Sequence, residues 1–221
     1  MTSRAGVLPR ILFGVVLLAV AFWLDRSAFH LFRAVTLYDH WGEMREGLTA
    51  AKFLASGLGI FVMGVIVWAL DRGRWRRAAA LWLIVLLASA AGSVLKVAVG
   101  RERPSRAGQV PGHERTVFHG PALGLHHASC QSFPSGHTLS AFASATTLAA
   151  FYPPAAPVFY AVAAATGVNR VVTHQHFLSD VVAGALLGHL LALLLLWRTR
   201  IRRLWWSENE GGRPGRSSLP S

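Results

Sequence analysis

Six apolar runs, each long enough to form a helix through most of a bilayer, constrain this chain more than any other feature. They cover about residues 8–24, 50–70, 78–99, 138–152, 155–168 and 181–197. A helix needs ~20 residues to cross about 30 Å of hydrocarbon. The fourth and fifth runs are short, but the prolines between them favour a tight turn that separates two helices. We therefore predict an all-α integral membrane protein that folds as a six-helix bundle.

The composition favours one membrane domain over a soluble protein with an anchor. Of the 221 residues, 53% are hydrophobic and only 14% are charged, which is too apolar for an ordinary soluble domain. Because the apolar runs are spread along the chain, we predict a single transmembrane domain over residues 1–206. Residues 207–221 are rich in glycine, serine and charges, and we predict that they form a disordered cytoplasmic tail.

The net charge of +12 is placed where a membrane protein needs it. Four basic residues lie between Asp71 and Arg77 and four between Arg198 and Arg203, in each case beside an apolar run. Clusters in this position bind anionic lipid headgroups and set topology. The pattern predicts a membrane partner, no nucleic acid, and both termini in the cytoplasm.

The segment after the first run has the pattern of a helix that lies in the membrane interface. Apolar residues recur there at helical spacing: Ala28, Leu31, Phe32 and Val35. Charged residues lie among them, as in an amphipathic helix with one face on the lipid. We predict an interfacial helix after the first span. The alternative is a solvent-exposed loop with scattered aromatic residues.

A first basic motif follows the third run. Lys96 lies one turn inside the end of the expected helix, and Arg103, followed by Pro104, lies just beyond it. Lysine presents a compact point charge, whereas the planar guanidinium of arginine suits two phosphate oxygens. Taken alone, these cations are more often anchors at the membrane interface, so a phosphate-binding role for them depends on two further motifs.

The second motif, Pro134-Ser135-Gly136-His137, immediately precedes the fourth run. We expect Ser135 near the N-cap of that helix, and Gly136 lets the backbone approach a ligand closely. Free amides at a helix N-terminus favour an anion. His137, in the first turn, is placed to give a proton to a departing oxygen.

The third motif consists of Arg170, His176 and Asp180. His176 and Asp180 are four residues apart, so a helical turn would place both on one face. A carboxylate that holds the Nδ1 proton of an imidazole leaves Nε2 free as a nucleophile. We predict that His176 is the nucleophile, that Asp180 orients it, and that Arg170 is a third cation for the phosphate.

The predicted topology brings the three motifs together, because the loop 100–137 and the turn 169–180 fall on the same outer face. Three cations, amide donors and two histidines with different neighbours suit a two-step phosphoryl transfer. One histidine attacks phosphorus, the other protonates the leaving group, and water hydrolyses the phosphohistidine. Positioning and charge stabilisation dominate such catalysis, so we predict neither a metal nor another cofactor.

These residues resemble the three-part signature of the type 2 phosphatidic acid phosphatase superfamily: K-x6-R-P, P-S-G-H and S-R-x5-H-x3-D. The match extends from Lys96 to Asp180, and Asn169 stands where the family usually has serine before the arginine. Asparagine can still donate a hydrogen bond to phosphate, so altered rather than abolished activity is expected. The resemblance implies a metal-independent phosphatase with a six-helix core.

The outer loop holds residues that could in principle bind zinc: His113, His119, His126, His127 and Cys130. Their spacing fits no standard ligand set, and we predict no metal site.

The sequence favours a lipid phosphatase of the inner (cytoplasmic) membrane with an external active site. Undecaprenyl diphosphate, lipid A and phosphatidylglycerophosphate are the candidate substrates. The alternatives are a lipid phosphotransferase that uses the same residues and a non-catalytic protein that binds anionic lipid.

Overall fold

The computed structural model describes residues 7–35, 42–71, 75–104 and 117–198. Within these ranges the chain is helical and has no strand beyond an isolated bridge between Arg101 and Phe118, so the all-α prediction is confirmed. The main helices are α1 (Val7–Val35), α2 (Gly42–Leu54), α3 (Gly57–Leu70), α4 (Trp75–Val99), α6 (Gly120–His126), α7 (Gly136–Phe151), α8 (Ala156–Val172) and α9 (Leu178–Arg198).

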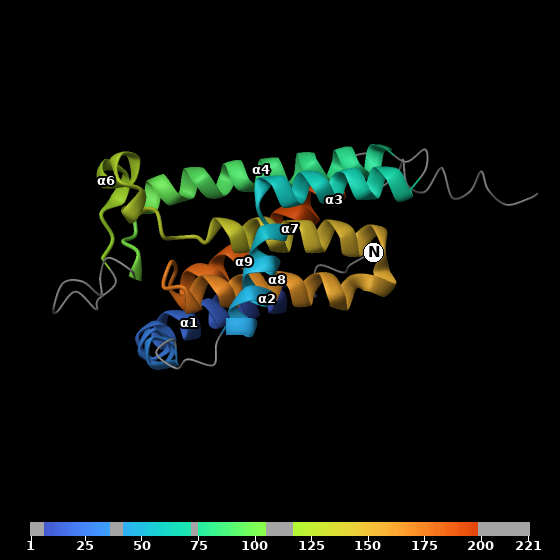
Figure 1. Ribbon diagram of the computed structural model, residues 1–221. Helices are drawn as coiled ribbons and strands as arrows, with labels where there is room; N and C mark the ends of the chain where they lie inside the picture. The colour runs from blue at the N-terminus through green and yellow to red at the C-terminus, as the bar shows by residue number, and fades with distance from the viewer. Residues whose placement is uncertain (1–6, 36–41, 72–74, 105–116, 199–221) are drawn as a thin grey trace, which may run out of the picture.

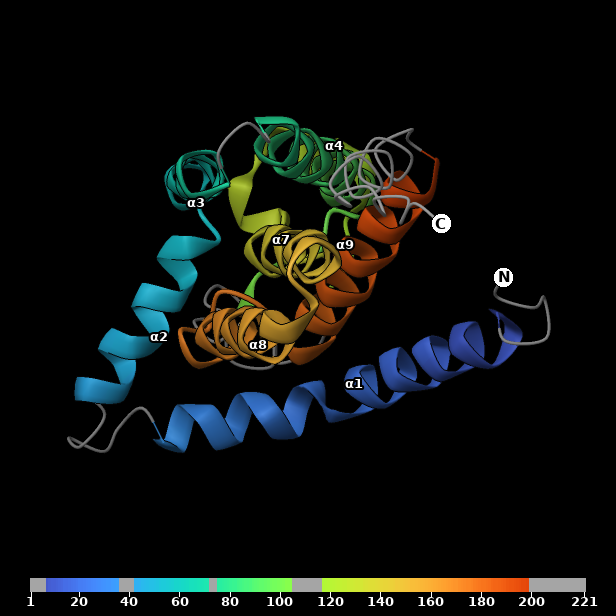
Figure 2. The same cartoon turned by 90° about the vertical axis from the view of Figure 1, so that its right-hand side faces the viewer.

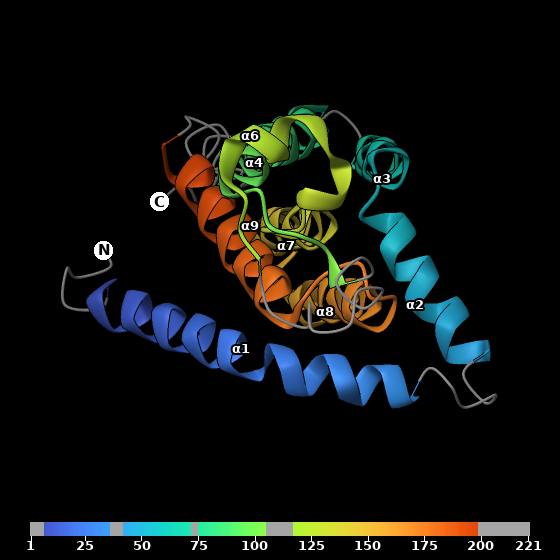
Figure 3. The same cartoon turned by 90° about the vertical axis from the view of Figure 1, so that its left-hand side faces the viewer.

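Helix α7 lies at the centre of the bundle, with α4, α8 and α9 around it (Figures 2 and 3). Its sequence is dominated by alanine, serine and threonine, and small residues allow helix backbones to approach closely in a membrane. Helix α9 contributes Gly184 and Gly188 to this contact. A Cβ at Gly188 would lie only 2.2 Å from the carbonyl oxygen of Leu139, so the two backbones are in direct contact.

Helix α1 is longer than the first apolar run, and this corrects one prediction. It continues unbroken to Val35, so Ala28, Leu31 and Phe32 belong to its last turns and form no separate interfacial helix. The charge of Asp25 does not end the helix, because that carboxylate is buried in an ion pair with Arg101. Helix α1 packs on α9 and α8, and Figure 1 shows it steeply inclined to α4 and α7.

The second apolar run is not one straight helix. It is divided between α2 and α3, which meet at an angle of 69°. Ser56 caps the new helix, because its hydroxyl accepts a hydrogen bond from the Gly59 amide at 3.2 Å. Gly59 is required at this break, since a Cβ there would lie 2.2 Å from the carbonyl oxygen of Phe53.

Among the described residues, four helices are long and apolar enough to cross a membrane: Leu12–Phe32, Trp75–Val99, Pro153–Val172 and Leu178–Trp197. The bent pair α2 and α3 adds a fifth if it crosses as one unit. Helix α7, with 16 residues, is shorter than the ~20 residues that span a bilayer. The chain is therefore a multi-pass membrane protein, but the six-helix count is not confirmed. The predicted tail, 207–221, lies outside the described residues.

The fold gathers four helix ends at one end of the bundle. Helices α4 and α8 finish there, and α7 and α9 begin there (Figure 1). The short helix α6 packs on the end of α4. The residues of all three sequence motifs therefore lie at the same end of the molecule.

Candidate active site

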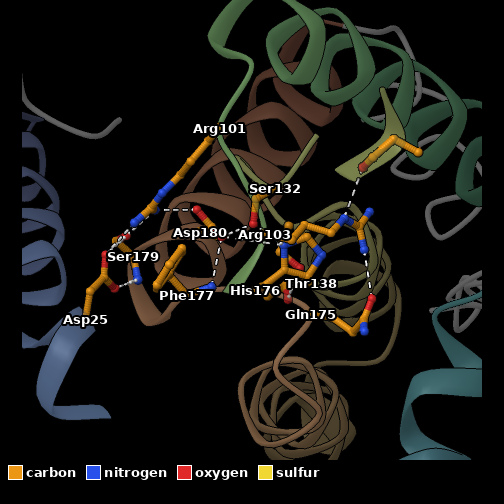
Figure 4. A network of polar contacts seen from close by, with 12 residues as sticks. Asp25, Arg101, Arg103, Ser132, Thr138, Gln175, His176, Phe177, Ser179 and Asp180 are labelled. Carbon is orange, nitrogen blue, oxygen red and sulfur yellow. Dashed lines mark hydrogen bonds and ion pairs between the residues drawn. The ribbon is translucent and has the colours of Figure 1, made fainter. Parts of the chain in front are cut away.

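Asp180 is completely enclosed by the residues around it. It lies in the first turn of α9 and is 0% exposed. One carboxylate oxygen, Oδ1, accepts a hydrogen bond from the Arg101 guanidinium at 2.5 Å. The other, Oδ2, accepts from the Ser132 hydroxyl at 2.5 Å and from the Phe177 amide at 2.9 Å (Figure 4). These partners fix the position of the carboxylate.

His176 lies beside this carboxylate, but not on a helix. Its Nδ1 is 3.6 Å from Asp180 Oδ2 and 3.4 Å from the Ser132 hydroxyl. Helix α9 begins only at Leu178, so the prediction of a shared helical face for His176 and Asp180 was wrong. A turn brings them together instead, and in it the His176 amide donates to the Arg170 carbonyl at 3.2 Å.

The surroundings of His176 keep its imidazole neutral. The side chain is 2% exposed, and burial lowers its pKa from the ordinary 6.5 to about 4, against the opposing effect of Asp180. Burial disfavours the charged form of a histidine. At neutral pH the ring is therefore neutral and, with Nδ1 directed at Asp180, its Nε2 is the nitrogen available for chemistry.

The three predicted cations come from three segments. Lys96 lies in the last turn of α4, and its Nζ is 3.1 Å from the point where a Cβ on Gly136 would stand. Arg103 donates from Nη1 to the Gln175 side-chain oxygen at 2.9 Å and from Nε to the Ala128 carbonyl at 3.2 Å. Arg170 is buried in the last turn of α8. Lys96 is within electrostatic reach of both arginines.

The start of α7 joins this cluster. Ser135 occupies the N-cap position, but its side chain caps no amide of α7. Its hydroxyl instead accepts from Thr138 at 2.9 Å, and its amide donates to the Asp180 carbonyl at 2.9 Å. The amides of Gly136, His137 and Thr138 open the helix and have no acceptor four residues earlier within it, as suits an anion. His137, partly buried in this turn, is within electrostatic reach of Arg170.

One pocket adjoins the cluster, and a second pocket lies next to the first. The first, of about 300 Å³, has Lys96, Gly136 and His137 in its wall, together with hydroxyl-bearing side chains of α4 and α7. The second, of about 280 Å³, is bounded mostly by apolar side chains of α2, α3, α7 and α8. The two share Ala55, at the break between α2 and α3. A polar pocket therefore adjoins an apolar one.

Asn169, at the position of the family serine, points its polar atoms into the protein. It is 2% exposed, and its Oδ1 is buried without a hydrogen-bond partner among the described residues. Its backbone carbonyl accepts from the hydroxyl of Thr173 at 2.7 Å. Asn169 directly precedes Arg170 in the sequence. Its contact with a phosphate stays a prediction.

Sequence reasoning missed three residues of the site: Asp25, Arg101 and Ser132. Each contacts Asp180 or a partner of Asp180. Asp25 carried a usable signal, because a carboxylate inside an apolar helix implies a buried partner. A fourth residue, Lys52 of α2, is within electrostatic reach of His137 and was also not anticipated.

The histidines of the loop 100–137 form no metal cluster in the part of the chain that the structure describes. His126 and His127 are exposed at the end of α6, and His119 pairs with Glu102 at 3.7 Å. Cys130 is buried as a free thiol. His113 lies outside the described residues.

Together, the fold and site define a helical membrane protein in which a buried histidine–carboxylate pair faces a cluster of cations. The sequence model of the PAP2 superfamily matches residues 77–204, more than half of the chain. The chain belongs to the PAP2 superfamily, and the resemblance drawn from its motifs is confirmed.

Two curated relatives are lipid A 1-phosphatases. The protein from Rhizobium etli is 34% identical over 114 residues, which cover 52% of this chain and 47% of the relative. The protein from Rhizobium johnstonii is 29% identical over 166 residues, which cover 70% of this chain and 65% of the relative. The matched regions span less than two thirds of the length of these relatives.

A solved structure shares the fold. It is a transmembrane PAP2-type phosphatidylglycerolphosphate phosphatase from Bacillus subtilis, with a TM-score of 0.61 and 23% sequence identity. The superposition covers 93% of this chain and 96% of the other. At this identity the likeness concerns the arrangement of helices.

Proposed function

We propose that this protein is a metal-independent lipid phosphatase that works through a phosphohistidine on His176. The observation that carries the proposal is the buried, neutral imidazole of His176 beside Asp180, at the same helix ends as Lys96, Arg103 and Arg170. A neutral imidazole is a nucleophile, and clustered cations stabilise the charge of a transferring phosphoryl group.

The reaction proceeds in two balanced steps. In the first, His176 Nε2 forms a bond to phosphorus while the bond from phosphorus to the lipid oxygen breaks. His137, which takes up a proton beside the bound phosphate anion, gives that proton to the departing oxygen. In the second, His137 takes a proton from water as the water oxygen attacks phosphorus, and the bond from phosphorus to nitrogen breaks. Asp180 stabilises the positive charge that develops on His176. Lys96, Arg103, Arg170 and the first amides of α7 hold the phosphate oxygens.

The paired pockets support a lipid substrate. We place the phosphate-bearing headgroup in the polar pocket beside Lys96 and His137, and an apolar chain in the adjoining pocket past Ala55. A lipid A phosphate is the first substrate to test, because the two curated relatives named above are lipid A 1-phosphatases. Undecaprenyl diphosphate and phosphatidylglycerophosphate are the other candidates.

The membrane arrangement is also a proposal. We propose six crossings, in which α7 and the bent pair α2 and α3 add two to the four long helices, with α2 as the part that lies in the interface. Both termini face the cytoplasm, and the site opens outside the inner membrane. The test labels single cysteines, introduced into a Cys130→Ser background, with a membrane-impermeant reagent on whole cells. Labelling at His126 and none at Trp75 is expected; the reverse pattern would invert the orientation.

Activity is tested by phosphate release from lipid A, undecaprenyl diphosphate, phosphatidylglycerophosphate and phosphatidic acid, with a chelator present. We expect release from at least one lipid by the wild type and by His126→Ala, whose side chain is exposed on α6. His176→Ala should release none. Acid-labile, base-stable labelling of the wild type by ³²P-lipid identifies the phosphohistidine. Phosphate found on a second lipid instead of in solution would make the protein a phosphotransferase, and lipid binding without turnover would make it non-catalytic.

A further inference from the structure

We infer that Arg101 and Asp25 are positioning residues, and that through them helix α1 sets the geometry of the His176–Asp180 pair. The inference rests on the proposed role of His176 as nucleophile. It adds two residues outside the set that the motifs identify. It also gives a part in the site to α1, all of which lies outside the region matched by the family model.

The guanidinium of Arg101 joins two carboxylates from distant parts of the chain. Its Nη1 donates to Asp180 Oδ1 at 2.5 Å, and its Nη2 donates to Asp25 Oδ2 at 2.7 Å. Ser179 closes the bridge, because Arg101 Nη1 donates to its hydroxyl at 2.6 Å, and that hydroxyl donates in turn to Asp25 Oδ2 at 2.6 Å. The Ser179 amide also donates to Asp25 Oδ1 at 2.8 Å. Asp25 thus holds both Arg101 and the first turn of α9 (Figure 4).

Arg101 also reaches the second oxygen of Asp180, through its backbone. The Arg101 carbonyl accepts a hydrogen bond from the Ser132 amide at 2.9 Å. The hydroxyl of the same serine donates to Asp180 Oδ2 and lies 3.4 Å from His176 Nδ1. One residue therefore fixes both carboxylate oxygens, one directly and one through Ser132.

The burial of Arg101 excludes direct contact with a substrate. Its side chain is 0% exposed, and its guanidinium carbon lies 4.3 Å from the centre of the Phe177 ring and 5.2 Å from that of Phe22. An arginine enclosed in this way acts on the reaction only through the groups it holds. Removing one partner of a buried ion pair leaves the other uncompensated.

The count of charges explains why a second carboxylate is needed. If Arg101 paired with Asp180 alone, its positive charge would neutralise that carboxylate. Asp180 would then interact less strongly with the Nδ1 proton of His176. Because Asp25 also pairs with the guanidinium, one positive and two negative charges meet here. The Asp25–Arg101–Asp180 group therefore keeps a net negative charge beside the imidazole. That charge favours the tautomer with the proton on Nδ1 and stabilises the imidazole when it becomes positive during phosphoryl transfer.

The test measures kcat and KM of Asp25→Asn and Arg101→Lys on the lipid that the wild type hydrolyses. For Asp25→Asn we expect kcat to fall about tenfold to hundredfold with KM changed less than about twofold, because no substrate contact is lost. Arg101→Lys keeps the charge but loses the fork, so its kcat should lie between those of the wild type and Arg101→Gln. Ser179→Ala, a milder change in the same bridge, should lower kcat with KM unchanged even if Asp25→Asn does not fold.

The matched control is Asp71→Asn. Asp71, at the end of α3, pairs with the buried Arg77 of α4 and accepts a hydrogen bond from Tyr152 at the end of α7. These contacts lie at the opposite end of the helices from the site. The Asp71→Asn variant should have a lower thermal unfolding midpoint, while its kcat per folded molecule stays at the wild-type value. An equal fall in kcat for Asp71→Asn and Asp25→Asn would show that only general stability is involved, and would overturn the inference.

A readout independent of activity separates this inference from the proposed function. In protein labelled with ¹⁵N-histidine, with His176 assigned by loss of its signals in His176→Gln, the wild type should show the Nδ1-protonated tautomer. Asp25→Asn should shift His176 toward the other tautomer. An unchanged tautomer together with an unchanged kcat would refute the positioning role. A wild type that hydrolyses no lipid would refute the proposed function, while the nitrogen spectrum would still decide whether Asp25 orients His176.

Discussion

Replacing Gly188 by alanine should damage both stability and activity, because Gly188 is where α9 touches the backbone of α7. A Cβ there would lie 2.2 Å from the Leu139 carbonyl oxygen and 3.0 Å from its carbonyl carbon. Real Cβ atoms essentially never come within 3.0 Å of such an atom, so the helices must separate locally by roughly 0.8 Å or more. Both partners are backbone, so no side-chain rotation relieves the contact.

The energetic cost follows from overpacking. Inserting one methyl group into a close-packed interior costs about 1–3 kcal/mol. The greater helix propensity of alanine stabilises the folded protein by up to about 1 kcal/mol and offsets part of this cost. We therefore expect a net loss of about 1–2 kcal/mol in the free energy of unfolding.

The same movement reaches the site. Helix α7 begins with Gly136 and His137, and α9, which begins two residues after His176, carries Asp180 in its first turn. Pushing α7 from α9 changes the distance between the proposed acid and the proposed nucleophile. A misplacement of ~1 Å can reduce a rate about hundredfold. We expect kcat to fall about tenfold to hundredfold, with little change in lipid binding.

Gly14→Ala is the matched control. Gly14 also lies inside a helix, and a Cβ there would stand 3.7 Å from the Leu186 side chain, an ordinary contact. The Gly14→Ala variant should have the wild-type kcat and an equal or higher thermal unfolding midpoint in the same detergent. The assay compares unfolding midpoints and phosphate release per folded molecule for both variants. A Gly188→Ala protein as stable and as active as Gly14→Ala would refute the close-contact reasoning.

Three further predictions concern other positions. Stability should decline as pH falls from 6.5 toward 4, because the unfolded chain protonates His176 in this window and the folded protein does not. The contribution of His176, read from unfolding midpoints, is at most about 3 kcal/mol, and the decline should be smaller by that amount in His176→Gln. Gly100→Ala should lower the unfolding midpoint, since Gly100 has φ +58° and a Cβ there would lie 2.1 Å from the Gly120 carbonyl oxygen; an unchanged midpoint contradicts this. Asn169→Ser, which restores the family residue, should change KM for the lipid phosphate while the unfolding midpoint stays within experimental error; identical kinetics would mean that this side chain does not meet the phosphate.

The sequence was most informative where chemistry depends on local spacing. Lys96, the loop before α7 and the segment from Arg170 to Asp180 were visible as motifs because each lies within a few residues of a helix end. The structure brings them to one end of the bundle. The turn that joins His176 to Asp180 was misassigned as a helix, because a spacing of four is the same in a helix and in a turn followed by a helix start.

Long-range pairing was the part that local patterns could not show. Asp25 suggested the end of a helix and the start of an interfacial segment, whereas Arg101, 76 residues away, buries that charge and lets α1 continue. Ser132 was overlooked because its hydroxyl acts only once the chain has brought it to Asp180. The break between α2 and α3 was hidden in a continuous apolar run, although Ser56, which caps α3, and Gly59 both mark it.

The pairing of Asp25 with Arg101 has a consequence for biogenesis. The ribosome completes α1 before it makes Arg101, and at about 5–20 residues per second the 76 intervening residues take ~4–15 s. During that interval the Asp25 carboxylate has no guanidinium, and a charge in hydrocarbon is costly. Helix α1 therefore keeps Asp25 near the headgroups until Arg101 is made, so the final docking of α1 follows the insertion of α4.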